Sequence, residues 1–371
     1  MTCIALSGYY GFYNTGDEAI LEVIIDFLQR QLPGVEVVVF SADPGHTRRT
    51  YGVEAVSRTH MSSIVRTLRR ADLLISGGGG LFQDITSFRS VVYYLGIIEL
   101  AMLMDKKVAV FAQGMGPLHH RMAMKWVKRV LDRVDLVSVR DPFSARFLEE
   151  LGVKREVRVT ADPVFSLTPA SQEEIKAFWR TQGIWKEQKQ LQVGIALRPF
   201  LHVTPFGVDI LETIIKACIY LEEEYGARLI FLPYHLQKDL PLARQVASRL
   251  SRQSLIMDRT LSAREVMCLI GGLDLLVGMR LHALIFAAVS GIPFVALPYD
   301  PKINAFLSRM GKETPAPLQE LTLDRLKQEL NEILSQQKRA GGEEPGKKIC
   351  GLKSEVQRAL QELLALVSDP G

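Results

Sequence analysis

The chain has 371 residues, of which 47% are hydrophobic and 23% charged, and its net charge is +4. This length predicts two domains, and the modest charge, with no basic patch interleaved with aromatic residues, argues against nucleic-acid binding. Four widely spaced cysteines fit a reducing cytoplasm and indicate neither a zinc site nor a disulfide framework. No segment predicts a signal peptide or a membrane span. We therefore expect a cytoplasmic protein, with peripheral association at the inner face of the cell membrane left open.

The chain opens with a predicted strand–helix–strand unit. A strand at residues 3–7 leads into a glycine-rich loop at 8–17, and an amphipathic helix follows to residue 32. The loop is not a GxGxxG sequence, so the dinucleotide fingerprint is absent. Backbone amides at a helix start suit an anion or a network of sugar hydroxyls. Tyr13 and Asn14 are therefore candidate ligands of such a group.

Asp17 ends this loop and has two interpretations. It is a candidate helix cap, and this interpretation is the rival of a second one, in which its carboxylate is the base for an attacking hydroxyl. A second glycine-rich loop, residues 77–80, follows a buried strand at 72–75. Four consecutive glycines let a ligand or another backbone approach without an intervening side chain. We favour a functional reason over a purely structural turn, which makes Gly78 and Gly79 candidate ligand-binding residues.

Arg140 stands at the end of another predicted strand, residues 136–139. Ligands of open α/β sheets bind at the carboxyl ends of the strands, so Arg140 is a candidate phosphate clamp. Ion pairing with Asp141 or Asp162 is the alternative and carries about equal weight.

The pattern along the chain predicts an α/β fold of two Rossmann-like, doubly wound domains facing a cleft, a GT-B-like layout. Residues 71–77 (ADLLISG) resemble residues 273–278 (LDLLVG), which supports two similar halves. The predicted organisation is an N-terminal acceptor domain at 1–168, a linker helix region at 169–191, a C-terminal domain at 192–345 and a C-terminal amphipathic helix at 350–368.

The most informative stretch lies at residues 273–304 in the second half. Its two predicted strands deliver Arg280 and His282 at one carboxyl-end turn and Lys302 at the next. Two cations flanking a titratable imidazole suit an anionic substrate that must be protonated. The alternative is structural: a satisfied core His282, Arg280 as a partner of a helix cap and a solvated Lys302. Arg198, at the end of the strand that opens this domain, is a further candidate cation.

Taken together, the motifs resemble those of the polysaccharide pyruvyl transferase family, and within it the bacterial cell-wall members. The resemblance covers most of the chain, from the first strand to about residue 311, and rests on the set of motifs rather than on any one of them. The motifs are 11–21 (GFYNTGDEAIL), 76–81 (SGGGGL), 138–141 (SVRD), 161–163 (ADP) and 278–282 (GMRLH).

The resemblance implies an enzyme that moves the enolpyruvyl unit of phosphoenolpyruvate onto N-acetylmannosamine of a lipid-linked disaccharide. The product, a 4,6-ketal, would serve a secondary cell-wall polymer that anchors the surface layer. The family's residues carry over to His282 as general acid and to Arg140 and Lys302 as phosphoenolpyruvate ligands. Arg280 and Arg198 are additions from this sequence. No cofactor and no metal are expected.

The chemistry of phosphoenolpyruvate agrees with these residues. Its carboxylate and phosphate need two or more cations, and protonation of its methylene carbon needs a general acid such as an imidazolium. Two other classes remain open: a GT-B glycosyltransferase that uses a nucleotide sugar, and a non-catalytic sugar-phosphate binding protein. Nucleotide retention would support the first, and binding that survives loss of His282 would support the second.

Overall fold

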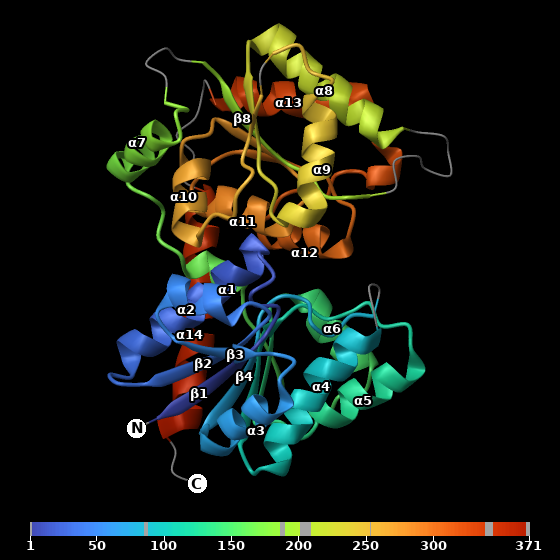
Figure 1. Ribbon diagram of the computed structural model, residues 1–371. Helices are drawn as coiled ribbons and strands as arrows, with labels where there is room; N and C mark the ends of the chain where they lie inside the picture. The colour runs from blue at the N-terminus through green and yellow to red at the C-terminus, as the bar shows by residue number, and fades with distance from the viewer. Residues whose placement is uncertain are drawn as a thin grey trace. The chain divides into compact units, whose positions relative to one another are not determined.

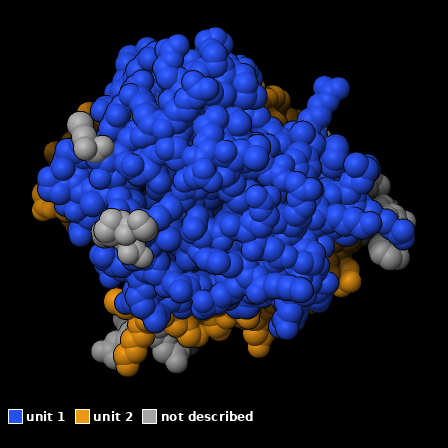
Figure 2. Space-filling model, turned by 90° about the horizontal axis from the view of Figure 1, so that it is seen from below, with its two compact units in different colours: residues 1–166, 351–371 blue, residues 167–350 orange. Residues whose placement is uncertain are grey.

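The computed structural model describes residues 2–84, 88–185, 190–200, 209–252, 254–337 and 344–368. Its internal contacts divide the chain into unit 1, Met1–Ser166 with Gly351–Gly371, and unit 2, Leu167–Cys350 (Figure 2). Each unit is built around one parallel sheet with helices on its faces (Figure 1). The α/β class with two doubly wound sheets is thus confirmed.

Unit 1 holds a seven-stranded sheet in the order β3-β2-β1-β4-β5-β6-β7. Its elements are β1 Cys3–Ser7, α1 Thr15–Gln31, β2 Glu36–Ser41, α2 Pro44–Tyr51, β3 Glu54–Ser57, α3 Met61–Arg70, β4 Leu73–Gly77, α4 Phe88–Leu103, β5 Lys107–Gln113, α5 Arg121–Leu131, β6 Leu136–Val139, α6 Pro142–Glu150, β7 Val157–Val159 and the 3-10 helix η1 Pro163–Ser166. Strands β1, β4 and β6 are buried at every position, as apolar runs between two helical layers should be.

The two faces of this sheet carry different helices. Helices α3, α4 and α5 contribute to one core cluster, through residues such as Leu68, Leu95 and Val127. Helix α1 packs on the other face (Figure 1). Its Ile24 lies against Gly77, where a Cβ would meet the Ile24 side chain at 3.0 Å. Both sheet faces are therefore closed to solvent, and the loops at the strand ends are left to carry functional groups.

Unit 2 holds a five-stranded sheet in the order β10-β9-β8-β11-β12. Its elements are α7 Gln172–Thr181, β8 Gln192–Ala196, α8 Ile210–Tyr225, β9 Arg228–Phe231, α9 Leu236–Ala247, β10 Leu255–Ile256, α10 Ala263–Gly271, β11 Leu275–Gly278, α11 Leu281–Val289, β12 Phe294–Ala296, α12 Pro301–Arg309, the 3-10 helix η2 Leu318–Glu320, α13 Leu323–Gln337 and α14 Glu344–Ser368. Helix α14 belongs to unit 1 from Gly351 onward.

The segment 169–191, expected as a linker, contains a helix that packs within unit 2. Helix α7 begins with a capping box of Ser171 and Glu174, and the Trp179 indole donates to the carbonyl of Cys268 at 3.0 Å. Trp179 is 3% exposed. The burial of Trp179 against α10 therefore makes the segment 169–191 part of unit 2, although most of its side chains are polar.

The five strands of the unit 2 sheet follow the same order as the first five strands of the unit 1 sheet. In each, the first strand pairs with both the second and the fourth, so that the order reverses between β1 and β4 and again between β8 and β11. The similar sequences 71–77 and 273–278 fall on the equivalent strands β4 and β11. Such reversal points leave a crevice at the strands' carboxyl ends, where ligands of this architecture bind.

Candidate active site

At the reversal point of unit 1, the glycine-rich loop after β4 packs against the first turns of α1. A Cβ on Gly78 would lie 2.3 Å from Ile20 Cγ2, and one on Gly79 would lie 2.4 Å from Asp17 Oδ1. Both glycines also have positive φ, of 66° and 79°. Close helix packing thus accounts for two of the four glycines, in addition to any contact with an acceptor.

Helix α1 is capped by Asn14, whose side chain accepts from the Gly16 amide at 3.3 Å. The alternative in which Asp17 caps the helix is therefore wrong. Asp17 lies within the first turn and is 8% exposed, with its carboxylate against the Cα of Gly79. Tyr13 has a φ of 58° and its hydroxyl donates to Asp43 at 2.6 Å.

Sequence reasoning overlooked Glu18, the neighbour of Asp17. Its carboxylate accepts from the Gly11 amide at 2.8 Å and from the Tyr51 hydroxyl at 2.9 Å. It is 4% exposed, and this burial raises the pKa of Glu18 to about 7, although both hydrogen bonds oppose the shift. Glu18 therefore ties the loop after β1 to the helix that follows it. The sequence did offer a signal for Glu18, because it forms a pair of adjacent carboxylates with Asp17 directly after a glycine-rich loop.

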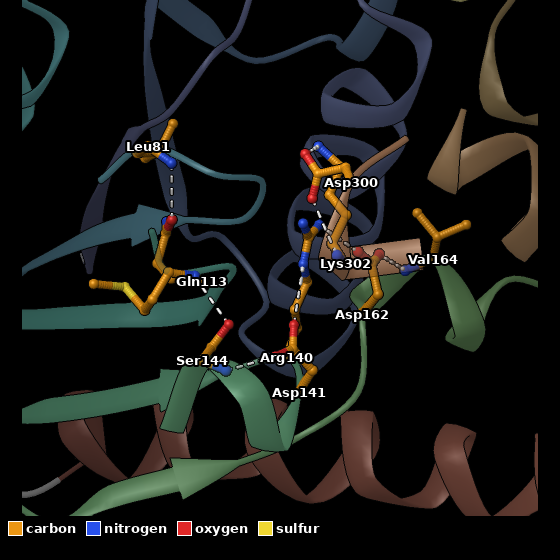
Figure 3. Close-up of polar contacts among 10 residues, drawn as sticks. Leu81, Gln113, Arg140, Asp141, Ser144, Asp162, Val164, Asp300 and Lys302 are labelled. Atoms are coloured by element: carbon orange, nitrogen blue, oxygen red, sulfur yellow. Dashed lines mark hydrogen bonds and ion pairs between the residues drawn. The ribbon is translucent and has the colours of Figure 1, made fainter. Parts of the chain in front are cut away.

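Arg140 lies at the carboxyl end of β6, next to the loop that follows β5. Its guanidinium pairs with Asp162 at 3.0 Å and lies 3.9 Å from Asp141, which caps α6 (Figure 3). A Cβ on Gly114 would lie 2.6 Å from Arg140 Nη2, so this glycine makes room for the side chain. The ion pair that sequence reasoning weighed as the alternative is thus present. This pair orients the guanidinium at the sheet edge. The binding of phosphoenolpyruvate by Arg140 stays a prediction.

The loop after β5 is itself held by buried side chains. Gln113 accepts from the Leu81 amide at 3.3 Å and donates to the Gly78 carbonyl at 3.2 Å. Ser144 accepts from the Met115 amide at 2.9 Å (Figure 3). These bonds join the loops after β4 and β5 to the start of α6, and therefore fix the backbone around Arg140.

In unit 2, Arg280 and His282 follow β11 and begin α11. Arg280 is the N-cap residue, without a side-chain cap, and His282 stands in the first turn. Arg280 Nε donates to Asp239 Oδ2 at 2.9 Å, and its Nη2 donates to the other oxygen of this carboxylate. His282 is half-buried, with Nε2 enclosed. Sequence reasoning did not foresee Asp239, which lies 41 positions from its partner.

Arg198 and Lys302 lie around one tyrosine at the same sheet edge. Arg198 follows β8 and stacks over the Tyr299 ring at 4.2 Å, while its Nη1 donates to the Tyr299 hydroxyl at 2.5 Å. Lys302 stands in the first turn of α12 rather than in a loop, and its Nζ lies 3.2 Å from Asp300 Oδ2. Its Nζ is also 5.5 Å from the same ring. The structure thus places both Arg198 and Lys302 near the Tyr299 ring.

Two features are absent from the part of the chain that the structure describes, a metal-binding group and a membrane-spanning helix. No group of three or more His, Cys, Asp or Glu side chains is placed to hold a metal ion among the residues described. Within the same ranges, no helix is both long enough and apolar enough to cross a membrane.

The fold and the charged residues at its reversal points define an α/β protein of the GT-B-like class. Anabaena Alr3699/HepE in complex with UDP-glucose is similar at a TM-score of 0.65 and 14% identity, over 99% of this chain and 100% of that chain. UDP-GlcNAc 2-epimerase from Neisseria meningitidis, bound to UDP-GlcNAc, is similar at a TM-score of 0.63 and 12% identity, over 99% of both chains. E. coli ADP-heptose lps heptosyltransferase II reaches a TM-score of 0.50 at 14% identity, over 91% of this chain and 100% of that chain. At these identities the likeness shows the fold alone.

The sequence identifies the family within this class. The polysaccharide pyruvyl transferase family matches residues 14–301, which is most of the chain. A search of curated proteins gives no match. The chain belongs to the polysaccharide pyruvyl transferase family and is an enzyme of that type.

Proposed function

We propose that this enzyme transfers the pyruvyl group of phosphoenolpyruvate onto N-acetylmannosamine of a lipid-linked ManNAc-GlcNAc disaccharide, forming a 4,6-ketal. The observation that carries the donor is the set of side chains at the carboxyl edge of unit 2. Each of three neighbouring strands, β8, β11 and β12, is followed by a cation, namely Arg198, Arg280 and Lys302. His282 lies between Arg280 and Lys302 in the sequence. Three cations and one imidazole match an anionic donor that must be protonated.

The reaction starts at the enol phosphate of phosphoenolpyruvate. His282, as imidazolium, gives its proton to the methylene carbon C3, and the C2 cation that develops is stabilised by its bonded oxygen. A sugar hydroxyl forms a bond to C2 and loses its proton to a base, for which we propose Asp17. The first product is a phosphorylated ketal that carries a methyl group.

Loss of phosphate completes the transfer. The C2–O bond to phosphate breaks with its electron pair, and Arg140 and Lys302 are proposed to neutralise the departing group. The second sugar hydroxyl then bonds to C2 and releases its proton. One phosphoenolpyruvate and one diol thus give one cyclic ketal and one inorganic phosphate.

The acceptor assignment rests on the family resemblance and on the loops of unit 1. Tyr13, Asn14, Gly78 and Gly79 all lie on the loops after β1 and β4, where backbone amides and close approach suit sugar hydroxyls. The product would serve a secondary cell-wall polymer and the anchoring of a surface layer. A lipid-linked acceptor would place the enzyme in the cytoplasm, at the inner face of the cell membrane.

One assay tests the proposal. Purified enzyme is given phosphoenolpyruvate with or without lipid-linked ManNAc-GlcNAc, and both phosphate release and ketal formation are measured. Acceptor-dependent release of one phosphate per ketal is expected. Consumption of UDP-glucose or another nucleotide sugar instead would indicate the glycosyltransferase alternative, and tight binding of phosphoenolpyruvate without turnover on any sugar would indicate a binding protein.

A further inference from the structure

His235 is a second histidine at the carboxyl edge of the unit 2 sheet. It follows β9, is the N-cap residue of α9 and is 6% exposed. Its side chain makes no capping bond to the helix. Among the described residues, Nδ1 is enclosed and has no hydrogen-bond partner. A buried polar atom of this kind costs about 1–3 kcal/mol, and more if it is a donor that carries a proton.

The backbone of His235 is fixed next to Arg280. The Asp239 carboxylate accepts from the amides of Tyr234, at 3.1 Å, and His235, at 2.9 Å, and it also binds the Arg280 guanidinium. One buried carboxylate therefore joins the loop after β9 to the loop after β11. His235 and His282 are consequently held on two tied loops of the same edge.

The surroundings of His235 determine its protonation state. Burial lowers its pKa, and the charges of Lys238 and Arg280 lower it further, while Asp239 acts in the opposite direction. The imidazole is therefore neutral near pH 7 and carries one proton. A proton on Nδ1 would be a buried donor without an acceptor, so the favoured tautomer has its proton on Nε2. The structure thus supplies a neutral N–H donor and leaves Nδ1 as the enclosed nitrogen.

We propose that His235 Nε2–H donates a hydrogen bond to the phosphate group of phosphoenolpyruvate, an assignment that rests on the proposed function. The start of α9 adds the positive end of a 12-residue helix, which favours an anion. The Arg280 guanidinium adds a cation beside the same loop. A phosphate accepts from several such donors at once, and His235 is therefore a binding residue for the donor substrate.

Calorimetric titration of the full chain tests this contact, because it needs no turnover. His235→Gln places an amide nitrogen near the position of Nε2, whereas His235→Asn places one near Nδ1. The affinity for phosphoenolpyruvate and for inorganic phosphate should fall tenfold or more in His235→Asn and His235→Ala. It should stay within threefold of the parent in His235→Gln. Pyruvate, which lacks the phosphate, should bind all variants alike.

The exposed neighbour Lys238 supplies the control. Lys238→Gln removes a nearby charge but no proposed contact, so its effect on phosphate affinity should be under threefold. Melting curves establish whether each variant is folded. If His235→Ala is not folded, the affinities of His235→Gln and His235→Asn are compared with each other, and this comparison tests the contact. Equal affinities in all variants, better retention in Asn than in Gln, or an equal loss for pyruvate would overturn the assignment. If the parent chain binds neither phosphoenolpyruvate nor phosphate, both the proposed function and the His235 assignment fail. This result differs from the three outcomes above, which overturn the His235 assignment alone.

Discussion

The Arg280 guanidinium binds the buried carboxylate of Asp239 through two nitrogens, with Nε 2.9 Å from Oδ2. Asp239 is 1% exposed and also accepts two backbone amides. The planar fork of Arg280 is thus used on a protein carboxylate, not left for a bidentate clamp on the substrate. Its charge remains at the sheet edge, and its main task in this arrangement is to hold two loops together.

Removal of Asp239 should therefore destabilise unit 2 strongly. Asp239→Ala leaves two amides and one guanidinium without their acceptor, and loss of one partner of a buried ion pair costs about 3–5 kcal/mol. Urea unfolding monitored by tryptophan fluorescence measures the change in the free energy of unfolding. The double variant Arg280→Met/Asp239→Leu should lose less free energy of unfolding than the two single variants lose in sum, because neither charge is then left without its partner. A loss below about 0.5 kcal/mol in Asp239→Ala would contradict this account.

His282→Gln should lower turnover by roughly a hundredfold or more, the usual contribution of a positioned general acid. The side chain is only half-buried, so we expect the melting temperature to stay within a few degrees. Acceptor-dependent phosphate release gives the rate. His119→Gln, at an exposed histidine of unit 1, is the matched control and should keep the parent rate. Near-normal turnover in a folded His282→Gln enzyme would remove the general-acid assignment.

Arg140→Lys and Lys302→Ala should raise KM for phosphoenolpyruvate far more than KM for the acceptor. Arg140→Lys keeps the charge and loses the planar geometry, so its effect reports on bidentate contacts. Because Arg140 is buried and paired with Asp162, this variant should also be less stable, whereas Lys302→Ala should not. Steady-state kinetics with each substrate varied in turn separates the two constants. Equal effects on both substrates would indicate a role in the structure of the loops instead.

Glu18 predicts a pH-dependent contribution to stability. Its pKa is raised in the folded chain to about 7, so between about pH 4.5 and 7 the folded state binds more protons than the unfolded state. Stability from this group is present below this window and is lost as pH rises through it. Glu18→Gln cannot titrate, so its free energy of unfolding relative to the parent should improve from pH 5 to pH 8, by up to about 3 kcal/mol. Denaturant unfolding at both pH values measures this, and parallel pH profiles of variant and parent would refute it.

Local patterns predicted the elements, because apolar runs and caps are short-range signals. The strand ends that carry Arg140, Arg280 and Lys302 could be located from such runs alone. Asp162, 22 positions from Arg140, was among the partners that the sequence offered. The partner of Arg280 could not be located, since Asp239 lies 41 positions away and only the folded sheet brings it near.

The same limit applies at the two glycine-rich loops of unit 1. A carboxylate at a helix start looks like a cap, but Asn14 takes this position and leaves Asp17 inside the first turn. The glycine run predicts a ligand loop, which stays a prediction, and a Cβ on Gly78 or Gly79 would also meet α1. Helix-to-loop packing is a three-dimensional property, and the spacing of residues along the chain does not encode it.

The last prediction separates pyruvyl transfer from nucleotide-sugar transfer. Transfer from a nucleotide diphosphate often uses a divalent ion to hold the leaving group, whereas in the proposed reaction Arg140 and Lys302 neutralise the departing phosphate and His282 supplies the activating proton. The chain also has no DxD and no HExxH sequence. We therefore expect phosphate release and ketal formation from phosphoenolpyruvate to continue after exhaustive chelation, and UDP- and GDP-sugars to stay intact with or without magnesium. If activity vanishes on chelation and magnesium or manganese restores it, charge neutralisation by these side chains is insufficient. If a nucleotide sugar is consumed, the reaction class itself is wrong.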